Sequence, residues 1–246
     1  MGLFDLSGKH LLITGASSGI GRSTAVLCAS LGASLTIIGR NEKRLNETLS
    51  SLSGEGHTAI CCDLTCSDSV YTMVDRLQLL DGIVYCAGIQ ETCLTKNVNN
   101  QVLDKLMNTN FSSTILLNSQ ILRKKLLKKN ASVVFISSVA ALRCAEIGNA
   151  IYSSTKAAIS SFARVLALEL ASRRVRVNIV SPGMVRTPLL DQFDMTAEQF
   201  RSDEQKYPLG YGSPEDVANT VAFLLSDATK WMTGTDIVLD GGLTLR

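Results

Sequence analysis

Short runs of apolar and β-branched residues alternate along this chain with longer segments of helical periodicity. The apolar runs are continuous rather than alternating, which is typical of strands covered by helices on both faces. Seven such runs predict strands, at His10–Thr14, Leu35–Gly39, Thr58–Cys62, Gly82–Cys86, Ser132–Ser137, Arg176–Val180 and Asp236–Leu239. The segments between them predict helices, at Gly19–Leu31, Lys43–Leu52, Ser67–Leu77, Val102–Leu127, Ala150–Ala171 and Pro214–Leu225.

This alternation predicts a single α/β domain over residues 1–246 with a doubly wound, Rossmann-type parallel sheet. Successive strand–helix–strand units connect with one handedness and stack helices on both faces of such a sheet. A chain of 246 residues suits one large domain better than two. The stretch 184–212 holds two prolines and weak periodicity. We expect it to be an insertion over one edge of the fold.

The first predicted strand runs directly into a glycine-rich turn, TGASSGIG at residues 14–21. Gly15 permits a tight turn, Gly19 lets the backbone approach a pyrophosphate, and Gly21 allows the helix to pack closely on the sheet. The helix that follows presents free N–H groups and its positive dipole end to phosphates. The turn therefore predicts a dinucleotide site, with a plain strand–helix turn as the alternative. The expected cofactor contacts in this segment are Gly15, Ser17, Ser18, Gly19, Ile20 and Gly21.

The end of the second strand favours NADP(H) over NAD(H). An NAD site usually places Asp or Glu there to bind the ribose hydroxyls, whereas this chain has Gly39 and Arg40. A guanidinium can hold a 2′-phosphate in bidentate fashion, and the Ser17 hydroxyl can add a donor. A solvated Arg40 is the alternative, and the neighbouring Glu42 weakens the argument.

The residues that follow the third strand are expected to reach the adenine. Asp63 and Leu64 occupy this position. A capping role for Asp63 before the next helix fits the sequence nearly as well.

Tyr152 and Lys156 lie four residues apart on one face of the helix predicted over 150–171. A tyrosine has a pKa near ~10 and is a poor acid at neutral pH, but a nearby ammonium lowers that pKa. Ser138 ends the fifth strand at the edge where open α/β sheets bind ligands, and its hydroxyl can stabilise a substrate oxygen. Ser137 is the second choice, and a turn-capping role is the alternative for either serine. These groups predict proton donation to a carbonyl oxygen.

Four segments in order, TGASSGIG, ISS, YSSTK and SPGMVRTP, resemble the short-chain dehydrogenase/reductase family. The resemblance extends from Lys9 to Leu243, and the overall pattern is similar to 3-oxoacyl-acyl-carrier-protein reductases and related carbonyl reductases. It implies a seven-stranded parallel sheet and hydride transfer between a nicotinamide cofactor and a carbonyl or alcohol.

The resemblance also implies roles for individual residues. Tyr152 would be the acid/base, Lys156 would tune it and bind the nicotinamide ribose, and Ser138 would orient the carbonyl. Asn110 would hold a water in the proton relay, with Asn108 as an offset alternative. The segment beside the nicotinamide would comprise Pro182, Gly183, Val185 and Thr187, with the Val185 backbone at the carboxamide.

Two departures from the family pattern stand out. The usual Asn-Ala-Gly step after the fourth strand is Cys86-Ala87-Gly88 here. A thiol cannot replace both the donor and the acceptor of an amide, so the sheet must be held differently at this point. Ala87 and Gly88 still allow close approach to the cofactor ribose. The interval from Ser138 to Tyr152 is also about one residue longer than in many relatives.

Composition and charge indicate which classes of partner and site the chain lacks. A net charge of +2 is too small to suggest nucleic acid or a membrane surface. Two histidines far apart in sequence and seven cysteines without a CxxC pair predict neither a metal site nor a disulfide framework. No signal-peptide pattern opens the chain and no apolar run is long enough to span a membrane. We expect a cytoplasmic protein with reduced thiols.

The substrate is expected to contact 184–212 and 142–151, and the sequence leaves its identity open. An acyl group on an acidic carrier protein would require a basic patch beside the pocket mouth. The candidates for that patch are Lys124, Lys125, Lys128, Lys129, Arg173 and Arg174. The alternatives are basic residues at helix ends that only complement the dipole, and a sugar, steroid-like or other small carbonyl substrate.

Two further expectations concern activity and assembly. A non-catalytic dinucleotide-binding protein would keep the glycine turn but would not need Tyr152 and Lys156, so their presence favours an enzyme. The helical segments 102–127 and 150–171 are apolar over more than one stripe. One face would pack on the sheet and another on a second subunit, which predicts a homotetramer or homodimer that also involves the C-terminal GGLTLR.

Overall fold

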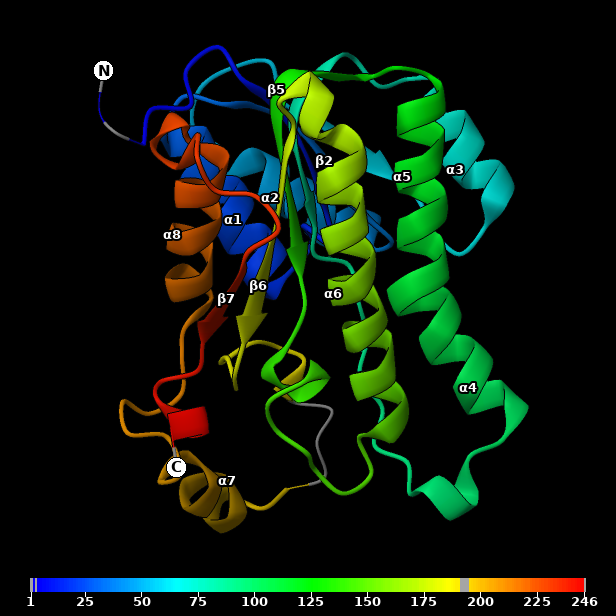
Figure 1. The fold of residues 1–246 in the computed structure, drawn as a ribbon, viewed down its shortest axis with the longest axis vertical. Helices are drawn as coiled ribbons and strands as arrows, with labels where there is room; N and C mark the ends of the chain where they lie inside the picture. Colours follow the sequence, from blue (N-terminus) through cyan, green and yellow to red (C-terminus); the bar gives the residue numbers. More distant parts are fainter. Residues whose placement is uncertain (1, 3, 191–194, 246) are drawn as a thin grey trace.

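The computed structural model describes residues 2, 4–190 and 195–245, and seven parallel strands form one sheet within them (Figure 1). The strand order is β3-β2-β1-β4-β5-β6-β7, so the chain reverses direction across the sheet between β1 and β4. The strands are β1 His10–Thr14, β2 Ser34–Gly39, β3 Thr58–Cys61, β4 Leu80–Tyr85, β5 Leu127–Ile136, β6 Arg176–Pro182 and β7 Asp236–Leu239. The predicted fold class is confirmed.

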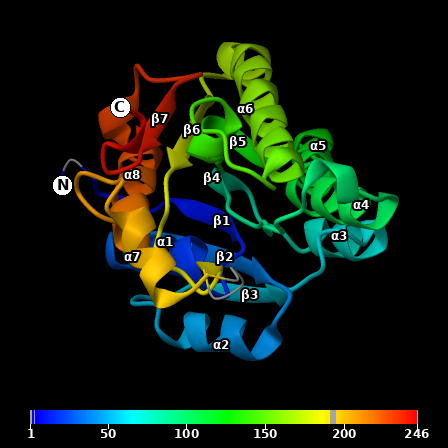
Figure 2. The same ribbon diagram turned by 90° about the horizontal axis from the view of Figure 1, so that it is seen from below.

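Helices cover both faces of the sheet, as the continuous apolar strands require. Helices α1, α2 and α8 lie on one face and α3, α5 and α6 on the other (Figure 2). The buried ring of Phe135 on β5 stacks on Tyr85 of β4 at a centroid distance of 4.7 Å under the second layer. The helices are α1 Gly19–Ser30, α2 Glu42–Ser50, α3 Ser67–Val74, α4 Asn100–Met107, α5 Ser113–Arg123, α6 Ala150–Leu170, α7 Ala197–Glu204 and α8 Pro214–Leu225.

The helix predicted over Val102–Leu127 is observed as one continuous helical path, but its predicted end is wrong. A π turn at Asn108–Ser112 joins α4 to α5, and β5 already begins at Leu127. Lys125 has a positive φ of 55°, which ends the helical path two residues earlier. The apolar run through Leu126 and Leu127 satisfies both a helical and a strand pattern, so periodicity alone does not separate them.

The predicted insertion 184–212 leaves and re-enters the fold at one point. Gly212 donates from its N–H to the Met184 carbonyl at 3.0 Å and accepts from Arg186 N–H at 2.9 Å. Helix α7, which sequence periodicity did not predict, lies within the excursion beyond the carboxyl ends of β6 and β7 (Figure 1). A capping box between Thr196 and Gln199 begins it. Residues 191–194 of the insertion lie outside the described part.

Apolar side chains remain exposed on the helices expected to meet a second subunit. Leu116 on α5 is 52 % exposed, and Val165 and Leu168 on α6 are 54 % and 80 % exposed. These residues form an uncovered apolar face on the single chain, and assembly through it stays a prediction. No helix in the described residues combines the length and the hydrophobicity needed to cross a bilayer.

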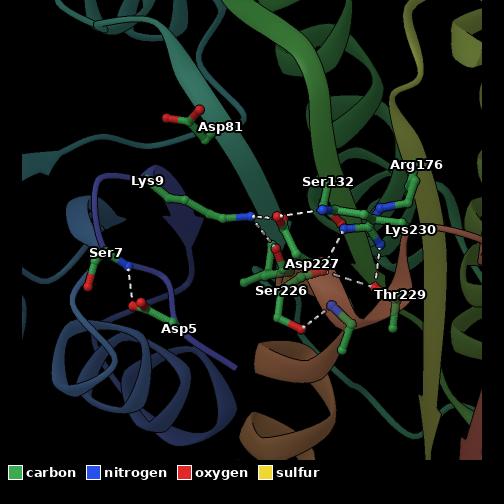
Figure 3. A network of polar contacts seen from close by, with 12 residues as sticks. Asp5, Ser7, Lys9, Asp81, Ser132, Arg176, Ser226, Asp227, Thr229 and Lys230 are labelled. Carbon is green, nitrogen blue, oxygen red and sulfur yellow. Dashed lines mark hydrogen bonds and ion pairs between the residues drawn. The ribbon is translucent and has the colours of Figure 1, made fainter. Parts of the chain in front are cut away.

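The carboxyl end of α8 is held by side chains from two neighbouring strands (Figure 3). Arg176, at the start of β6 and buried, donates to the Leu224 carbonyl at 2.7 Å and to the Ser226 carbonyl at 3.1 Å. Ser132 of β5 donates to the same Leu224 carbonyl at 2.8 Å. The last carbonyls of a helix have no partner within the helix, and a cation there complements the dipole. Arg176 therefore fixes α8 against the sheet.

We expect Arg176→Met to lower the free energy of unfolding by about 2–4 kcal/mol, because it removes the charged hydrogen bonds that a buried guanidinium donates to the last carbonyls of α8. Urea denaturation followed by circular dichroism measures the change. Arg164→Met, at an exposed position on α6, should change the free energy of unfolding by less than about 0.5 kcal/mol. Equal losses in the two variants would contradict this role for Arg176.

Candidate active site

Two connected cavities open at the carboxyl ends of the strands, where β1 and β4 diverge. The larger, of about 600 Å³, follows the glycine turn, and the smaller, of about 140 Å³, lies beside α6. Residues shared by both walls include Ile20, Cys86, Gly88, Ile89 and Thr187. The two cavities therefore adjoin one another. We call them the glycine-turn cavity and the helix-side cavity.

Nearly all the residues predicted from the sequence line one of these cavities. The glycine-turn cavity is lined by Gly15, Ser17, Ser18, Gly19, Ile20, Gly21, Arg40, Asp63, Leu64, Cys86, Ala87, Gly88 and Thr187. The helix-side cavity is lined by Ser138, Tyr152, Lys156, Pro182, Gly183 and Val185, and also by Ser137. Asn110 lines neither and is buried behind them.

The glycine turn is shaped for close backbone approach. Gly15 has a φ of +71°, and a Cβ there would lie 2.8 Å from the Ala87 nitrogen. A Cβ on Gly21 would lie 2.4 Å from the Gly15 carbonyl oxygen. Ser18 begins α1 without a side-chain capping bond, and no acidic residue lies in the first turn. The first N–H groups of α1 thus remain available, and the cavity fits a pyrophosphate-containing dinucleotide.

The Thr14 hydroxyl holds the Cys86-Ala87-Gly88 step. Its oxygen accepts from the N–H of Cys86 at 3.1 Å and from the N–H of Ala87 at 3.2 Å. The same hydroxyl donates to the Val84 carbonyl at 3.4 Å. The end of β1 therefore holds the loop after β4 without an amide at position 86. Sequence analysis placed Thr14 in the turn but did not predict this role.

Two arginines line the glycine-turn cavity beyond the end of β2. Arg40 and Arg44 both line it, and Arg44 lies in the first turn of α2, which Asn41 caps by accepting from its N–H at 2.9 Å. Asp63 also lines this cavity, while its Oδ1 accepts from the N–H of Thr65 at 2.9 Å. Asp63 thus caps the turn at Thr65, and the N-cap of α3 is Cys66.

The two candidate serines have different surroundings. Ser137 is buried, and its hydroxyl donates to the Lys156 carbonyl at 3.0 Å and lies 2.8 Å from Ser160 Oγ. Ser138 is half-buried, accepts from the Ala140 N–H at 3.2 Å, and lies beside the Tyr152 hydroxyl. The geometry favours Ser138 as the hydroxyl facing a ligand.

The π turn brings the Asn110 amide to the loop after β4. Its Oδ1 accepts from the Ile89 N–H at 2.8 Å, and its Nδ2 donates to the Ile89 carbonyl at 2.9 Å and to Thr155 Oγ1 at 3.2 Å. Asn108, the offset alternative, is exposed. Asn110 is therefore the asparagine that joins the loop to α6. π turns occur often at functional sites because they reposition one helical residue.

Comparison with known proteins places this geometry in a family. A family model described as enoyl-(acyl carrier protein) reductase matches residues 15–244. The chain belongs to the short-chain dehydrogenase/reductase family. A 3-oxoacyl-acyl-carrier-protein reductase, FabG, of Rickettsia felis is 34% identical over 244 residues, covering 99% of this chain and 100% of that protein. The resemblance stated from the motifs is confirmed, and this chain is a short-chain oxidoreductase.

Further relatives support the same assignment. Carbonyl reductase family member 4 of Danio rerio is 32% identical and covers 95% of this chain and 97% of that one. The crystal structure of a short-chain type dehydrogenase/reductase from Mycobacterium marinum superposes with a TM-score of 0.90 at 33% identity. It covers 99% of this chain and 98% of that chain.

The expected lowering of the Tyr152 pKa by Lys156 is wrong for the free oxidoreductase. Burial raises the pKa of Tyr152 to about 12, and only the Ser138 hydroxyl beside it acts in the opposite direction. Burial also lowers the pKa of Lys156 to about 8. Lys156 Nζ lies 5.7 Å from the Tyr152 ring centroid and donates to the Ile136 carbonyl at 2.9 Å. Burial is the largest cause of both pKa shifts.

The basic cluster expected beside the pocket mouth lies at the opposite edge of the sheet. Helices α5 and α6 end at the amino-terminal ends of β5 and β6, whereas the cavities open at the carboxyl ends. Lys128 pairs with Asp81 at 2.8 Å, Lys124 pairs with Asp75, and Arg173 donates to the Leu127 carbonyl. These residues hold the connections into the strands and do not line either cavity.

Several cavity residues were not named individually from the sequence, although those within 142–151 and 184–212 lie in the segments expected to contact the substrate. They come from loops and helix ends that carry no regular pattern. On the glycine-turn cavity they include Asn41, Arg44, Thr65 and Thr109. On the helix-side cavity they are chiefly Gln90, Cys144, Glu146, Asn149 and Tyr207. The usable signal for Glu146 and Asn149 was their position just before Tyr152, in the segment expected to contact the substrate.

The lowered pKa of Lys156 makes stability depend on pH in a defined window. Between about pH 8 and 10.5 the unfolded chain holds a proton on Lys156 that the folded chain has lost, so stability rises with pH there. The measured quantity is the difference in free energy of unfolding between the cofactor-free protein and the Lys156→Met variant. This difference should increase by about 2–3 kcal/mol from pH 8 to pH 10.5. Urea denaturation at each pH measures it. The same difference taken with Lys43→Met, at an exposed position, should not change with pH. A difference for Lys156→Met that does not change with pH would contradict the lowered pKa of Lys156.

Proposed function

We propose that this oxidoreductase reduces a small carbonyl compound to an alcohol with NADPH, and that Tyr152 donates the proton. The observation that carries the proposal is that Ser138, Tyr152 and Lys156 line the helix-side cavity where it meets the glycine-turn cavity. A non-catalytic dinucleotide-binding protein would need no such meeting of a phenol, a hydroxyl and a buried amine.

The residues of this chain divide the work. Bound NADPH supplies the hydride. Tyr152 and Ser138 hold the carbonyl oxygen by hydrogen bonds, and the phenol passes its proton to that oxygen as charge develops. The ammonium form of Lys156 stabilises the negative charge of the Tyr152 phenolate. Asn110 acts as a positioning residue by tying the loop at Ile89 to α6, and the relay water that the family resemblance assigns to it belongs to the same proposal.

The pKa of Tyr152 gives the cofactor a second role in this proposal. Burial of Tyr152 and Lys156 keeps the phenol protonated and favours loss of the ammonium proton in the free protein. A phenol with its proton is the required form for carbonyl reduction. Hydrogen bonds from a bound ligand to Lys156 would favour its ammonium form, which in turn stabilises the phenolate formed during the reaction.

NADP(H) rather than NAD(H) is the proposed cofactor because Arg40 and Arg44 both line the glycine-turn cavity beyond the end of β2. Two guanidinium groups suit the two negative charges of a 2′-phosphate. Asp63, the nearest acid on this wall, already accepts hydrogen bonds from the backbone and the hydroxyl of Thr65. The ribose hydroxyls that an NAD site binds through a carboxylate have a weaker acceptor here.

A 3-oxoacyl thioester is the second candidate substrate. The observation that favours it is the 34% identity with the Rickettsia felis reductase over the full length of both chains. The absence of the expected basic cluster from the cavity side, within the described residues, weighs against a carrier-bound form.

Tyr152→Phe should lower kcat by about 10³-fold or more with a carbonyl substrate, because it removes the proton donor. The dissociation constant for NADPH, measured by fluorescence titration, should stay within about twofold since the ring remains. Tyr71→Phe, at an exposed position on α3, serves as the control and should keep full activity. Near-normal turnover by Tyr152→Phe would sink the mechanism.

Arg40→Met should reduce the preference for NADPH over NADH by about tenfold or more, because one of two guanidinium groups facing the 2′-phosphate is lost. The ratio of kcat/KM values for the two cofactors measures it. Arg164→Met on α6 should leave the ratio unchanged. A wild-type preference for NADH would overturn the cofactor assignment while leaving the roles of Tyr152 and Lys156 intact.

A further inference from the structure

A row of three polar side chains lines the helix-side cavity next to Tyr152. Gln90 Nε2 donates to Asn149 Oδ1 at 3.0 Å, and Asn149 Nδ2 donates to Glu146 Oε2 at 2.9 Å. All three residues belong to the cavity wall. Asn149, at the centre of the row, is buried with 5 % of its surface exposed, and it directly precedes the helix that carries Tyr152. We call these residues the polar row.

The carboxylate at one end fixes the direction of every hydrogen bond in the polar row. A carboxylate only accepts, so Asn149 must present its NH₂ group to Glu146 and its oxygen to Gln90. Gln90 must in turn present its NH₂ group to Asn149. Within the described residues, Glu146 Oε1 and Gln90 Oε1 accept no hydrogen bond. The groups left for a ligand are therefore chiefly acceptors, which call for a ligand with donors.

Charge around the row points the same way. The carboxylates of Glu146, Asp203 and Asp240 each raise the pKa of the Cys144 thiol in the cavity wall, after the larger effect of burial. The ammonium group of Lys206 acts in the opposite direction, and it pairs with Asp203 at 2.8 Å. The wall itself holds one carboxylate, Glu146, and one ammonium group, Lys156. Together with the Asp203–Lys206 pair and Asp240 nearby, these groups sum to one negative charge, which disfavours an anionic ligand.

We propose that the polar row selects a carbonyl substrate that carries hydroxyl groups on the carbons next to the carbonyl. This inference rests on the proposed carbonyl reduction and narrows its substrate class. Tyr152 and Ser138 hold the carbonyl oxygen, and a neighbouring hydroxyl donates to Glu146 or Gln90. An unsubstituted alkyl chain would displace water from the half-buried Gln90 and the exposed Glu146 without offering them a donor, which costs binding energy. The small cavity of about 140 Å³ suits a short substrate of this kind.

A matched pair of ketones tests the proposal. In 1,3-dihydroxypropan-2-one two hydroxyl groups occupy the positions of the two terminal methyl groups of pentan-3-one, so the pair differs in hydrogen bonding at similar size. With NADPH, kcat/KM should be at least about 100-fold higher for the dihydroxy ketone, since sites built to bind a hydroxyl reject analogues that lack it. An acetoacetyl thioester, measured in parallel, should be the poorer substrate as well.

Variants of the row give the residue-level test. Glu146→Met should lower the preference for the dihydroxy ketone by about tenfold, through a higher KM for that substrate with little change for pentan-3-one. Gln90→Met should act in the same direction and guards against a folding defect in the first variant. Glu91→Met is the matched control, because Glu91 pairs with the exposed Lys105 and does not line the cavity.

The outcomes separate this inference from the proposed function. Equal reduction of the two ketones or a better rate with the thioester, with Glu146→Met neutral, overturns the hydroxyl selection and leaves carbonyl reduction standing. NADPH binding without turnover of any of the three substrates overturns the proposed function and the inference with it. A loss of preference in Glu91→Met equal to that in Glu146→Met shows an effect of net charge alone and overturns the role of the row.

Discussion

The contact between the end of β1 and the loop after β4 is the constraint on which the rest of the site depends. The strands part here because the chain order reverses, and the Thr14 hydroxyl holds the Cys86 and Ala87 N–H groups across the gap. Gly15 then passes so close to Ala87 that a side chain would collide with the backbone. This close backbone contact forms part of the wall of the glycine-turn cavity and lies near the place where it meets the helix-side cavity.

Much of the fold was predictable because burial on both faces leaves a direct trace in sequence. Each of the seven predicted strands overlaps an observed one, since parallel strands under two helical layers must be apolar throughout. Boundaries failed where one pattern satisfies two structures, as at Leu126–Leu127. The π turn of Asn108–Ser112 was not predicted either, because helical periodicity cannot distinguish it from an ordinary helix.

The catalytic candidates were predictable because they lie on or just beyond regular elements, with Tyr152 and Lys156 one turn apart and Ser138 two residues past the end of β5. The pairing of Gln90 with Glu146 through Asn149 was not predictable, because loop conformation brings together residues 56 positions apart. The basic cluster shows the opposite failure. Lys124 and Arg173 are chemically suited to an acidic partner, but chain topology alone determines which edge of the sheet they occupy.

The hydrogen bonds that join the two ends of the insertion 184–212 allow its sequence to change independently of the rest of the fold. Because Met184 and Gly212 are hydrogen-bonded neighbours, the excursion between them leaves the fold and returns at one point. Its length and sequence can change in evolution without moving β6 or the glycine-turn cavity. A longer loop adds little to the entropic cost of folding once its ends are fixed. Changes within the insertion can therefore alter the substrate in evolution, while the residues that line the glycine-turn cavity stay the same.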